Sequence, residues 1–271
     1  MNEPDRSVDG VVIHRDVVHT QVTGYRPLAL DLYLPTGDVA ALCVYTHGGG
    51  WLRGSRRLGP GPLTPTSARL FARAARQGLA MASVDYRLSG EAPFPAQAQD
   101  VAAAIAHLDA ARDRLGLGAA PLVTWGVSAG GQLAALRALD TAAEPRTVAC
   151  ALWYSPSDLR TMPVIPVDDG PSREQRLLGG TVEERAALAA EASPMTHVHA
   201  DAPPFLLLHG ELDNAVPRTE SEQLHEALGA SGVDSTLEIV AGYDHMFAGM
   251  PDEDVEAHVD RTTQFLLARA R

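Results

Sequence analysis

The chain has 271 residues, of which 45% are apolar and 21% are charged, as in ordinary folded globular proteins. This composition excludes a disordered or fibrous protein, and no apolar run reaches the roughly 18 residues that a membrane-spanning helix needs. The formal net charge of −12 argues against a nucleic-acid partner, because nucleic-acid binding depends on a basic surface. The sequence therefore predicts a globular protein that binds neither nucleic acid nor membrane.

The amino terminus and the two cysteines indicate the compartment. The first ten residues are polar and acidic, without the basic start and apolar stretch of a secretory signal. Cys43 and Cys150 each lie in an apolar run interpreted as a buried strand, so we expect two unpaired thiols. Both observations predict a cytoplasmic protein, since free buried thiols are typical of a reducing compartment.

Apolar runs and turn residues predict the elements of the first half of the chain. Strands are expected where short apolar or alternating runs end at glycine, proline or polar clusters. These runs lie at residues 11–18, 28–34, 41–46, 79–84, 121–125 and 148–154. Helices are expected at residues 66–77, 96–114 and 129–140, the second with apolar residues at helical spacing.

The alternation of strands and helices stops at residues 155–202, which contain several prolines and one short helical piece near 182–191. This stretch is too short for a core of its own, so we interpret it as a cap-like insertion over the sheet and not as a second domain. The alternation then resumes, with strands expected at residues 204–209 and 236–240 and helices at 219–230 and 252–270.

This order of elements predicts an α/β protein with a single domain over residues 1–271. Strands that alternate with helices form a mostly parallel central sheet with helices on both faces. The two opening strands have no helix between them, so we expect them to form an antiparallel edge of that sheet.

Residues 126–130, Gly-Val-Ser-Ala-Gly, fit the pattern G-x-S-x-G. The pattern alone is weak, because a Gly- and Ser-rich turn without chemistry would match it too. Here it follows an apolar strand and precedes a helix, which is the context of a nucleophile elbow. We therefore predict that Ser128 has a strained backbone and is a catalytic nucleophile.

A second glycine-rich segment, residues 47–51, follows another predicted strand. Its glycines allow the backbone to turn N–H groups toward a ligand, although a merely flexible loop has the same composition. We predict that N–H groups of this loop, together with that of Ala129, form an oxyanion hole.

Neighbours of these groups have expected supporting roles. Trp51 and Val127 adjoin the oxyanion hole and the nucleophile, so we expect them to contact the substrate. His47 ends the strand before the glycines and is interpreted as a structural hydrogen-bonding residue, with a catalytic base as the alternative. Tyr86 and Arg87 are interpreted as a brace of the core near this loop, with Arg87 paired to an acid.

A serine nucleophile needs a base, and the base needs an acid that orients it. In an elbow of this kind the acid and the base follow the serine along the chain. Asp213 lies in a loop after a predicted strand, and Glu211 and Asp158 are the competing acids. His245 lies in a loop at the same expected edge of the sheet and is the predicted base.

Two other groups of residues carry weaker expectations. His197 and His199 have the spacing of a metal-binding pair, but no carboxylate or cysteine cluster supports them, so we expect no metal site there. Met162, Val164 and Ile165 in the insertion are candidates to line a pocket, with placement in the core or toward solvent as the equal alternative.

Taken together, these features resemble an α/β-hydrolase of the hormone-sensitive-lipase-like group, especially the bacterial carboxylesterase branch close to the BD-FAE family. The resemblance covers nearly the whole chain and is carried by residues 47–51, 85–95, 126–131, 178–180, 192–194, 209–213 and 242–247. It implies a triad of Ser128, Asp213 and His245 and hydrolysis of carboxylic esters without a cofactor. It also implies that Gly49, Gly50 and Ala129 form the oxyanion hole. Val127 departs from the group, which often has Asp or Glu before the nucleophile.

The sequence thus predicts a serine esterase that acts on small-molecule esters through an acyl-enzyme. Short acyl chains are expected, because the insertion offers no long amphipathic helix that could open on a lipid surface. Two alternatives stay open: an amidase, formamidase or peptidase that uses the same three residues, and a ligand-binding member of the fold without catalysis. As a protein partner, only a second copy of the chain, in a homodimer, is considered.

Overall fold

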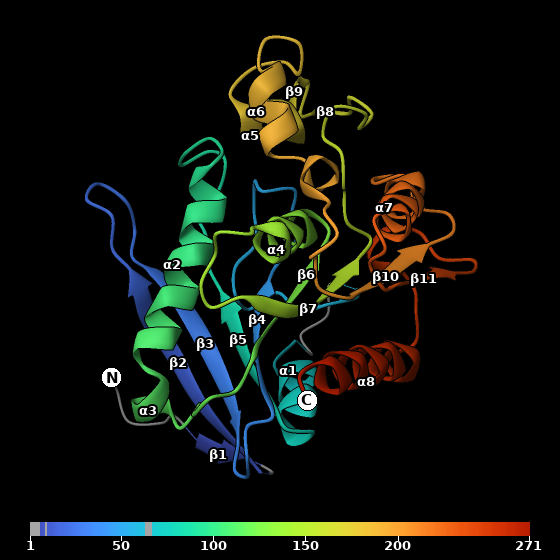
Figure 1. The fold of residues 1–271 in the computed structure, drawn as a ribbon. Helices are drawn as coiled ribbons and strands as arrows, with labels where there is room; N and C mark the ends of the chain where they lie inside the picture. The colour runs from blue at the N-terminus through green and yellow to red at the C-terminus, as the bar shows by residue number, and fades with distance from the viewer. Residues whose placement is uncertain (1–5, 9, 63–66) are drawn as a thin grey trace.

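The computed structural model describes residues 6–8, 10–62 and 67–271. Within these residues, nine strands form one sheet in the order β1-β2-β3-β5-β4-β6-β7-β10-β11 (Figure 1). The strands are β1 (Arg6–Val8), β2 (Val11–Thr20), β3 (Leu28–Pro35), β4 (Ala41–Thr46), β5 (Leu79–Val84), β6 (Leu122–Val127), β7 (Thr147–Trp153), β10 (Phe205–Gly210) and β11 (Ser235–Val240). Together with its helices, this sheet confirms the predicted α/β-hydrolase fold.

The sheet is parallel from β5 through β4, β6, β7 and β10 to β11, and antiparallel from β5 through β3 to β1. Strands β4, β5, β6 and β10 are buried at every residue because helices cover both faces. The pairing of β2 with β3 confirms the predicted antiparallel edge. The short strand β1 was not predicted, and it pairs with β2 at the outer edge.

Two groups of helices cover the sheet (Figure 1). One face packs against α1 (Ser67–Arg76) and α8 (Asp252–Arg269), and the other against α2 (Ala96–Ala110), α4 (Ala129–Leu139) and α7 (Thr219–Ala230). Arg73 ties α1 to α8, since its guanidinium lies 2.6 Å from the carboxylate of Asp260 and 2.7 Å from that of Glu256.

The predicted helix at 96–114 is two helices in the structure. α2 ends at Ala110, and α3 (Arg112–Leu115) begins after Ala111, whose φ of −107° is not helical. The left-handed Gly116 then closes α3 and lets the chain turn back to β6. Residue 66, the first of another predicted helix, lies outside the described residues.

Residues 155–202 contain several short elements that lie above α4 in the view of Figure 1. They are β8 (Pro166–Val167), β9 (Gly170–Ser172), α5 (Arg173–Leu178), α6 (Ala186–Glu191) and the 3₁₀ helix η1 (Pro194–His197). The helix predicted at 182–191 is therefore shorter than expected, and α5 was missed. α5 begins with a capping box between Ser172 and Gln175 and ends at the left-handed Gly179, signals that were present in the sequence.

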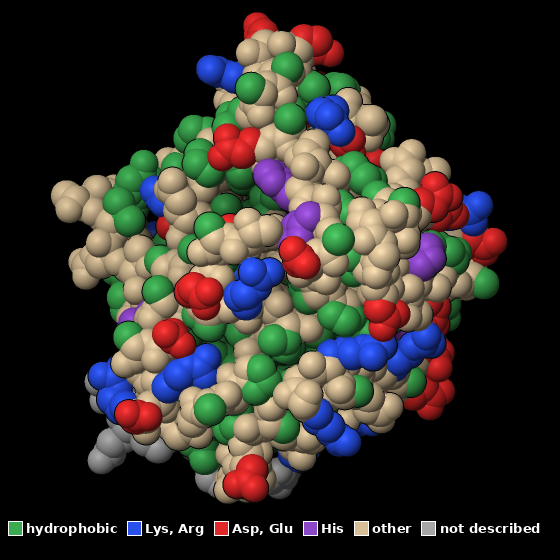
Figure 2. Space-filling model, in the orientation of Figure 1, with side chains coloured by type: hydrophobic (Ala, Val, Ile, Leu, Met, Phe, Trp, Pro, Cys, Tyr) green, Lys and Arg blue, Asp and Glu red, His purple; other side chains and the backbone are tan. Residues whose placement is uncertain are grey.

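The charged surface and the two buried cysteines agree with what the composition predicts. Arginine and acidic side chains intermingle over the face shown in Figure 2. Cys43 and Cys150 are free and buried, as predicted. In the described parts of the chain, no helix combines the length and the apolarity that crossing a membrane would require.

The turn between β6 and α4 leaves no space for a side chain at two glycines. A Cβ atom at Gly126 would lie 2.3 Å from the carbonyl oxygen of Gly130, and one at Gly130 would lie 2.2 Å from that of Thr46. Both distances are far inside van der Waals contact, so a larger residue would force the backbones apart. The two glycines of the G-x-S-x-G pattern are therefore packing requirements.

We expect Gly126→Ala to lower the free energy of unfolding by about 2 kcal/mol or more, because the added methyl group meets backbone that cannot move freely. Gly229→Ala is the matched control, since Gly229 lies in α7 with open space at its Cβ position. That change should raise the free energy of unfolding by about 0.5–1 kcal/mol. Chemical denaturation measures both values, and a neutral Gly126→Ala would contradict the close approach.

Candidate active site

Ser128 lies in the turn between β6 and α4. Its φ of 51° and ψ of −129° are a strained combination for a residue with a side chain, as the elbow predicts. Its backbone N–H donates to the carbonyl oxygen of Trp153 in β7 at 2.9 Å, which holds the turn on the sheet. The side chain of Ser128 is 8% exposed and lines a large cavity.

The imidazole of His245 lies against Ser128. Its Nε2 is 2.9 Å from the Oγ of Ser128. His245 begins the 3₁₀ helix η2 (His245–Phe247) after β11, and its backbone N–H donates to the carboxylate of Asp244 at 2.6 Å. The ring of Tyr154 meets the imidazole edge to face, with 5.0 Å between the ring centroids. These contacts hold the imidazole in the position from which it reaches the serine.

Asp213 lies behind the imidazole, in the loop after β10. Its Oδ2 is 2.7 Å from the Nδ1 of His245 and 3.2 Å from the Nε2 of His209, and its Oδ1 accepts the backbone N–H groups of Ala215 and Val216. Burial alone would raise the pKa of Asp213, but hydrogen bonds from His209 and His245 outweigh burial and hold the pKa well below its usual range. The carboxylate is therefore ionised at neutral pH.

The two competing acids have other partners. Glu211 accepts the backbone N–H of Gly242 at 2.9 Å, and Asp158 forms an ion pair with Arg160 at 2.6 Å. Among the described residues, the carboxylate that contacts the imidazole of His245 is that of Asp213. The structure thus brings together the three residues that the sequence singled out.

The glycine loop lies beside Ser128, at the end of β4. Gly49 and Gly50 have φ values of 119° and 63°, and a Cβ at Gly49 would lie 2.1 Å from the carbonyl oxygen of Arg53. The backbone at Gly49 therefore requires glycine, and Gly50 has the left-handed conformation that glycine favours. Gly49, Gly50 and Ala129 line the same cavity as Ser128.

The side chain of His47 packs beneath the glycine loop, between the loop backbone and Tyr86. Its buried imidazole stacks on Tyr86 with 4.3 Å between the ring centroids, and its Nδ1 lies 2.7 Å from the carbonyl oxygen of Gly48. The hydroxyl of Tyr86 donates to the carbonyl oxygen of His47 at 2.8 Å. Burial lowers the pKa of His47 to about 4. The ring is a neutral structural group, as interpreted from the sequence, and Arg87 pairs with Asp100 at 2.8 Å, as predicted.

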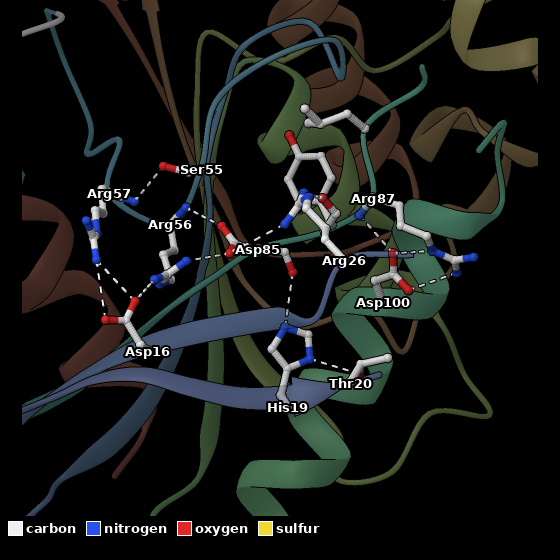
Figure 3. Close-up of polar contacts among 12 residues, drawn as sticks. Asp16, His19, Thr20, Arg26, Ser55, Arg56, Arg57, Asp85, Arg87 and Asp100 are labelled. Atoms are coloured by element: carbon white, nitrogen blue, oxygen red, sulfur yellow. Dashed lines mark hydrogen bonds and ion pairs between the residues drawn. The ribbon is translucent and has the colours of Figure 1, made fainter. Parts of the chain in front are cut away.

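A cluster of charges holds the chain that follows the glycines (Figure 3). The guanidinium of Arg56 lies 2.8 Å from the carboxylate of Asp31 and 2.6 Å from that of Asp85, and it also pairs with Asp16. Asp31 and Asp85 are 1% and 3% exposed, so Arg56 neutralises charges that water cannot reach. The cluster joins the glycine loop to β2, β3 and the end of β5.

The cavity has a volume of about 450 Å³. Trp51, Val127 and Met162 line it, and all three are buried. Val164 and Ile165 are 63% and 36% exposed and lie outside the cavity wall, so of the two expected placements they have the solvent-facing one.

Several lining residues were not predicted from the sequence: Tyr154, Arg173, Glu174 and Met246. Met246 follows His245 directly, so its place in the sequence could have predicted that it lines the cavity. Arg173 and Glu174 lie in the insertion, where no pattern in the sequence points to the cavity.

The pair His197 and His199 has protein partners. The Nε2 of His197 lies 2.8 Å from the carbonyl oxygen of Glu191, and that of His199 lies 3.2 Å from the carbonyl oxygen of Leu139. Across the described residues, no three His, Cys, Asp or Glu side chains gather in a geometry that could hold a metal ion.

Comparison with known proteins identifies the family. The model of the BD-FAE family matches residues 30–228. The chain belongs to the BD-FAE family. Among relatives, this BD-FAE protein is 30% identical to the esterase LipQ of Mycobacterium tuberculosis over 77% of its length, and it spans 51% of LipQ. It is 29% identical to an ethyl acetate hydrolase of Pseudomonas putida, with 92% of this chain and 78% of the relative covered.

Solved structures show the same fold. A truncated form of a carbohydrate esterase from gut microbiota superposes with a TM-score of 0.81 over 99% of this BD-FAE protein and 98% of the other chain. The two sequences are 23% identical, so this likeness concerns the fold alone.

We expect Arg56→Met to lower the free energy of unfolding by about 3 kcal/mol, because it leaves the buried carboxylates of Asp31 and Asp85 without their closest cation. Arg69→Met is the control: Arg69 is half exposed and pairs with Asp252 and Glu256 at the surface, so its loss should cost less than about 1 kcal/mol. Equal losses in a denaturation experiment would contradict the role given to Arg56.

Proposed function

We propose that this protein is a serine carboxylesterase that hydrolyses small-molecule esters. The observation that carries the proposal is the pair of short contacts, 2.9 Å from Ser128 to His245 and 2.7 Å from His245 to Asp213, beside a glycine loop in a cavity. Membership of the BD-FAE family and the esterase names of its relatives support the same reaction class.

The proposed reaction has two halves. Ser128 attacks the ester carbonyl while Nε2 of His245 takes the hydroxyl proton, and Asp213 accepts the hydrogen bond from Nδ1 and stabilises the imidazolium. His245 gives the proton to the leaving alcohol, and the acyl group remains on Ser128. Water then attacks the acyl-enzyme, His245 takes its proton and returns it to Ser128, and the acid leaves.

The backbone N–H groups of Gly49, Gly50 and Ala129 are the proposed oxyanion hole. They would hold the negative charge that develops on the carbonyl oxygen of the tetrahedral intermediate. The glycine conformations of the loop and the helix start at Ala129 support this assignment.

We also propose a short acyl chain and a cap. The cavity volume of about 450 Å³ and the lining by Trp51, Val127 and Met162 suit a small substrate. Leu177 and Leu178 of α5 are buried in the same core as α2, which supports a single domain with residues 155–202 as its cap. The free, buried cysteines support a cytoplasmic location.

Replacing the proposed nucleophile should abolish hydrolysis without unfolding the protein. We expect Ser128→Ala to reduce kcat for p-nitrophenyl butyrate by roughly 10⁶-fold, while Tm stays close to that of the parent, because the hydroxyl lies in a cavity and not in the core. An organophosphate should add one label to the parent protein, on Ser128, as peptide mass mapping would show. A label on another serine would contradict the assignment.

The role of Asp213 is tested by two matched substitutions, each of which replaces a carboxylate with the corresponding amide. Asp213→Asn should reduce kcat by about 10⁴-fold, since the imidazole loses the anion that orients it. Glu211→Gln, in the same loop, should cause a far smaller loss. Comparable losses in the two variants would remove Asp213 from the proposed triad.

The substrate class is tested with a series of p-nitrophenyl esters from acetate to palmitate and the matching anilides. We expect kcat/KM to be highest for short chains and much lower for anilides, because an amine must be protonated as it leaves and His245 is the proposed acid for that step. A maximum at palmitate would indicate a lipase. Anilide rates equal to ester rates would indicate an amidase.

A further inference from the structure

The charge of the cavity wall is opposite to that of the whole protein. Three arginines, Arg53, Arg57 and Arg173, and one carboxylate, that of Glu174, line the cavity. The chain as a whole has a net charge of −12. A cleft lined with an excess of one sign concentrates ligands of the other sign, because its apolar walls focus the field.

Arg173 lies against the glycine loop. It is the first residue of α5, and its side chain passes over Gly50: a Cβ at Gly50 would lie 2.4 Å from the Cδ of Arg173 and 3.0 Å from its Nε. A side chain at residue 50 would meet the stem of Arg173. This contact places the stem of Arg173 beside one of the proposed oxyanion donors.

The guanidinium of Arg173 has no ionic partner in the described part of the protein. No carboxylate of the described residues lies within 4.0 Å of it, whereas Arg56 and Arg87 pair with buried acids. Arg57, on the same wall, pairs with Asp16 at 3.1 Å. Arg53, the third arginine of the wall, has no ionic partner among the described residues either, but it is exposed, whereas Arg173 is partly buried. Of the two unpaired arginines on the cavity wall, Arg173 is therefore the less open to solvent.

Glu174 does not neutralise Arg173, although it is the next residue. Its Oε2 accepts the hydroxyl proton of Ser172 at 2.8 Å, and its carboxylate forms no ion pair within 4.0 Å with the guanidinium of Arg173. The side chain is 7% exposed. The cavity therefore offers an anion a cation at Arg173 and a repulsive group at Glu174, which favours one side of the cavity over the other.

We propose that Arg173 binds a carboxylate of the substrate, so that the natural ester carries an anionic group near its scissile bond. A planar guanidinium can hold a carboxylate through two parallel hydrogen bonds, and such charged bonds are stronger inside a cleft than in water. The inference rests on the proposed esterase function and adds the class of substrate. The anionic group lies either on the acyl chain or on the alcohol.

Two matched pairs of esters separate these two sources. The acyl pair is mono-p-nitrophenyl adipate and p-nitrophenyl hexanoate, which have acyl chains of equal length. The alcohol pair is the butyrate ester of meta-hydroxybenzoate and that of meta-hydroxybenzamide. The measured quantity is the ratio of kcat/KM for the anionic ester to that for its neutral partner, after subtraction of the uncatalysed rate.

In the parent protein we expect this ratio to exceed one for at least one pair. Arg173→Gln should lower that ratio by about ten- to a hundredfold, the range expected for a hydrogen bond between charged groups. Arg173→Lys keeps the positive charge but loses the planar guanidinium, so its ratio should lie between that of the parent protein and that of Arg173→Gln. Arg185→Gln removes an exposed arginine of the same segment that lies outside the cavity wall, and it should leave the ratio unchanged.

The outcomes distinguish the inference from the function on which it rests. If the parent protein hydrolyses neutral esters but prefers them in both pairs, or if Arg173→Gln and Arg185→Gln give the same ratio, the inference is wrong and the esterase proposal stands. If the parent hydrolyses neither neutral nor anionic esters, the esterase proposal itself fails. A thermal melt of each variant shows whether it is folded. Competitive inhibition of p-nitrophenyl hexanoate hydrolysis by adipate is a second measurement of anion binding, and it needs no turnover of an anionic ester.

Discussion

The contact of Gly130 with the end of β4 determines the geometry on which the rest of the site depends. A Cβ at Gly130 would lie 2.2 Å and 2.3 Å from the carbonyl oxygens of Thr46 and His47, so only glycine lets α4 approach β4 this closely. The hydroxyl of Thr46 donates to the carbonyl oxygen of Gly130 at 2.6 Å and fixes the approach. Ser128 leads into α4, and the glycine loop leaves β4. One backbone contact therefore sets the distance between the serine and the loop.

Electrostatic pairing keeps these two segments in place, and an arginine without such a partner lies on the cavity wall. Arg56 binds two buried carboxylates beneath the loop, and the ionised Asp213 receives hydrogen bonds from two histidines. Buried charges need such partners because desolvation is costly. Arg173 lacks a carboxylate partner among the described residues, and it lies on the wall beside Gly50. In this protein, the paired charges stabilise the site, and the guanidinium of Arg173 is available to a ligand.

Most of the fold could be predicted because its signals are local. Each long parallel strand is an apolar run bounded by turn residues, and its burial on both faces follows from that composition. β1, β8 and β9 were missed because strands of two or three residues have too few positions for a periodic pattern. The break between α2 and α3 was missed because Ala111 is a good helix former, and its conformation is set by the packing around it. α5 was missed although its capping box was readable.

The sequence by itself determined which residue types follow which strand: a glycine loop after β4, a serine between two glycines after β6, acids after β10 and a histidine after β11. Parallel strands end at the same edge of a sheet, so the fold class alone brings these loops together. The tertiary structure decided which side chains meet there. It placed Asp213 rather than Glu211 against His245, turned Val164 and Ile165 to solvent, and brought Arg173 over Gly50. Such contacts join segments far apart in the chain, and they depend on the packing of whole elements, for which no local pattern of residues provides a signal.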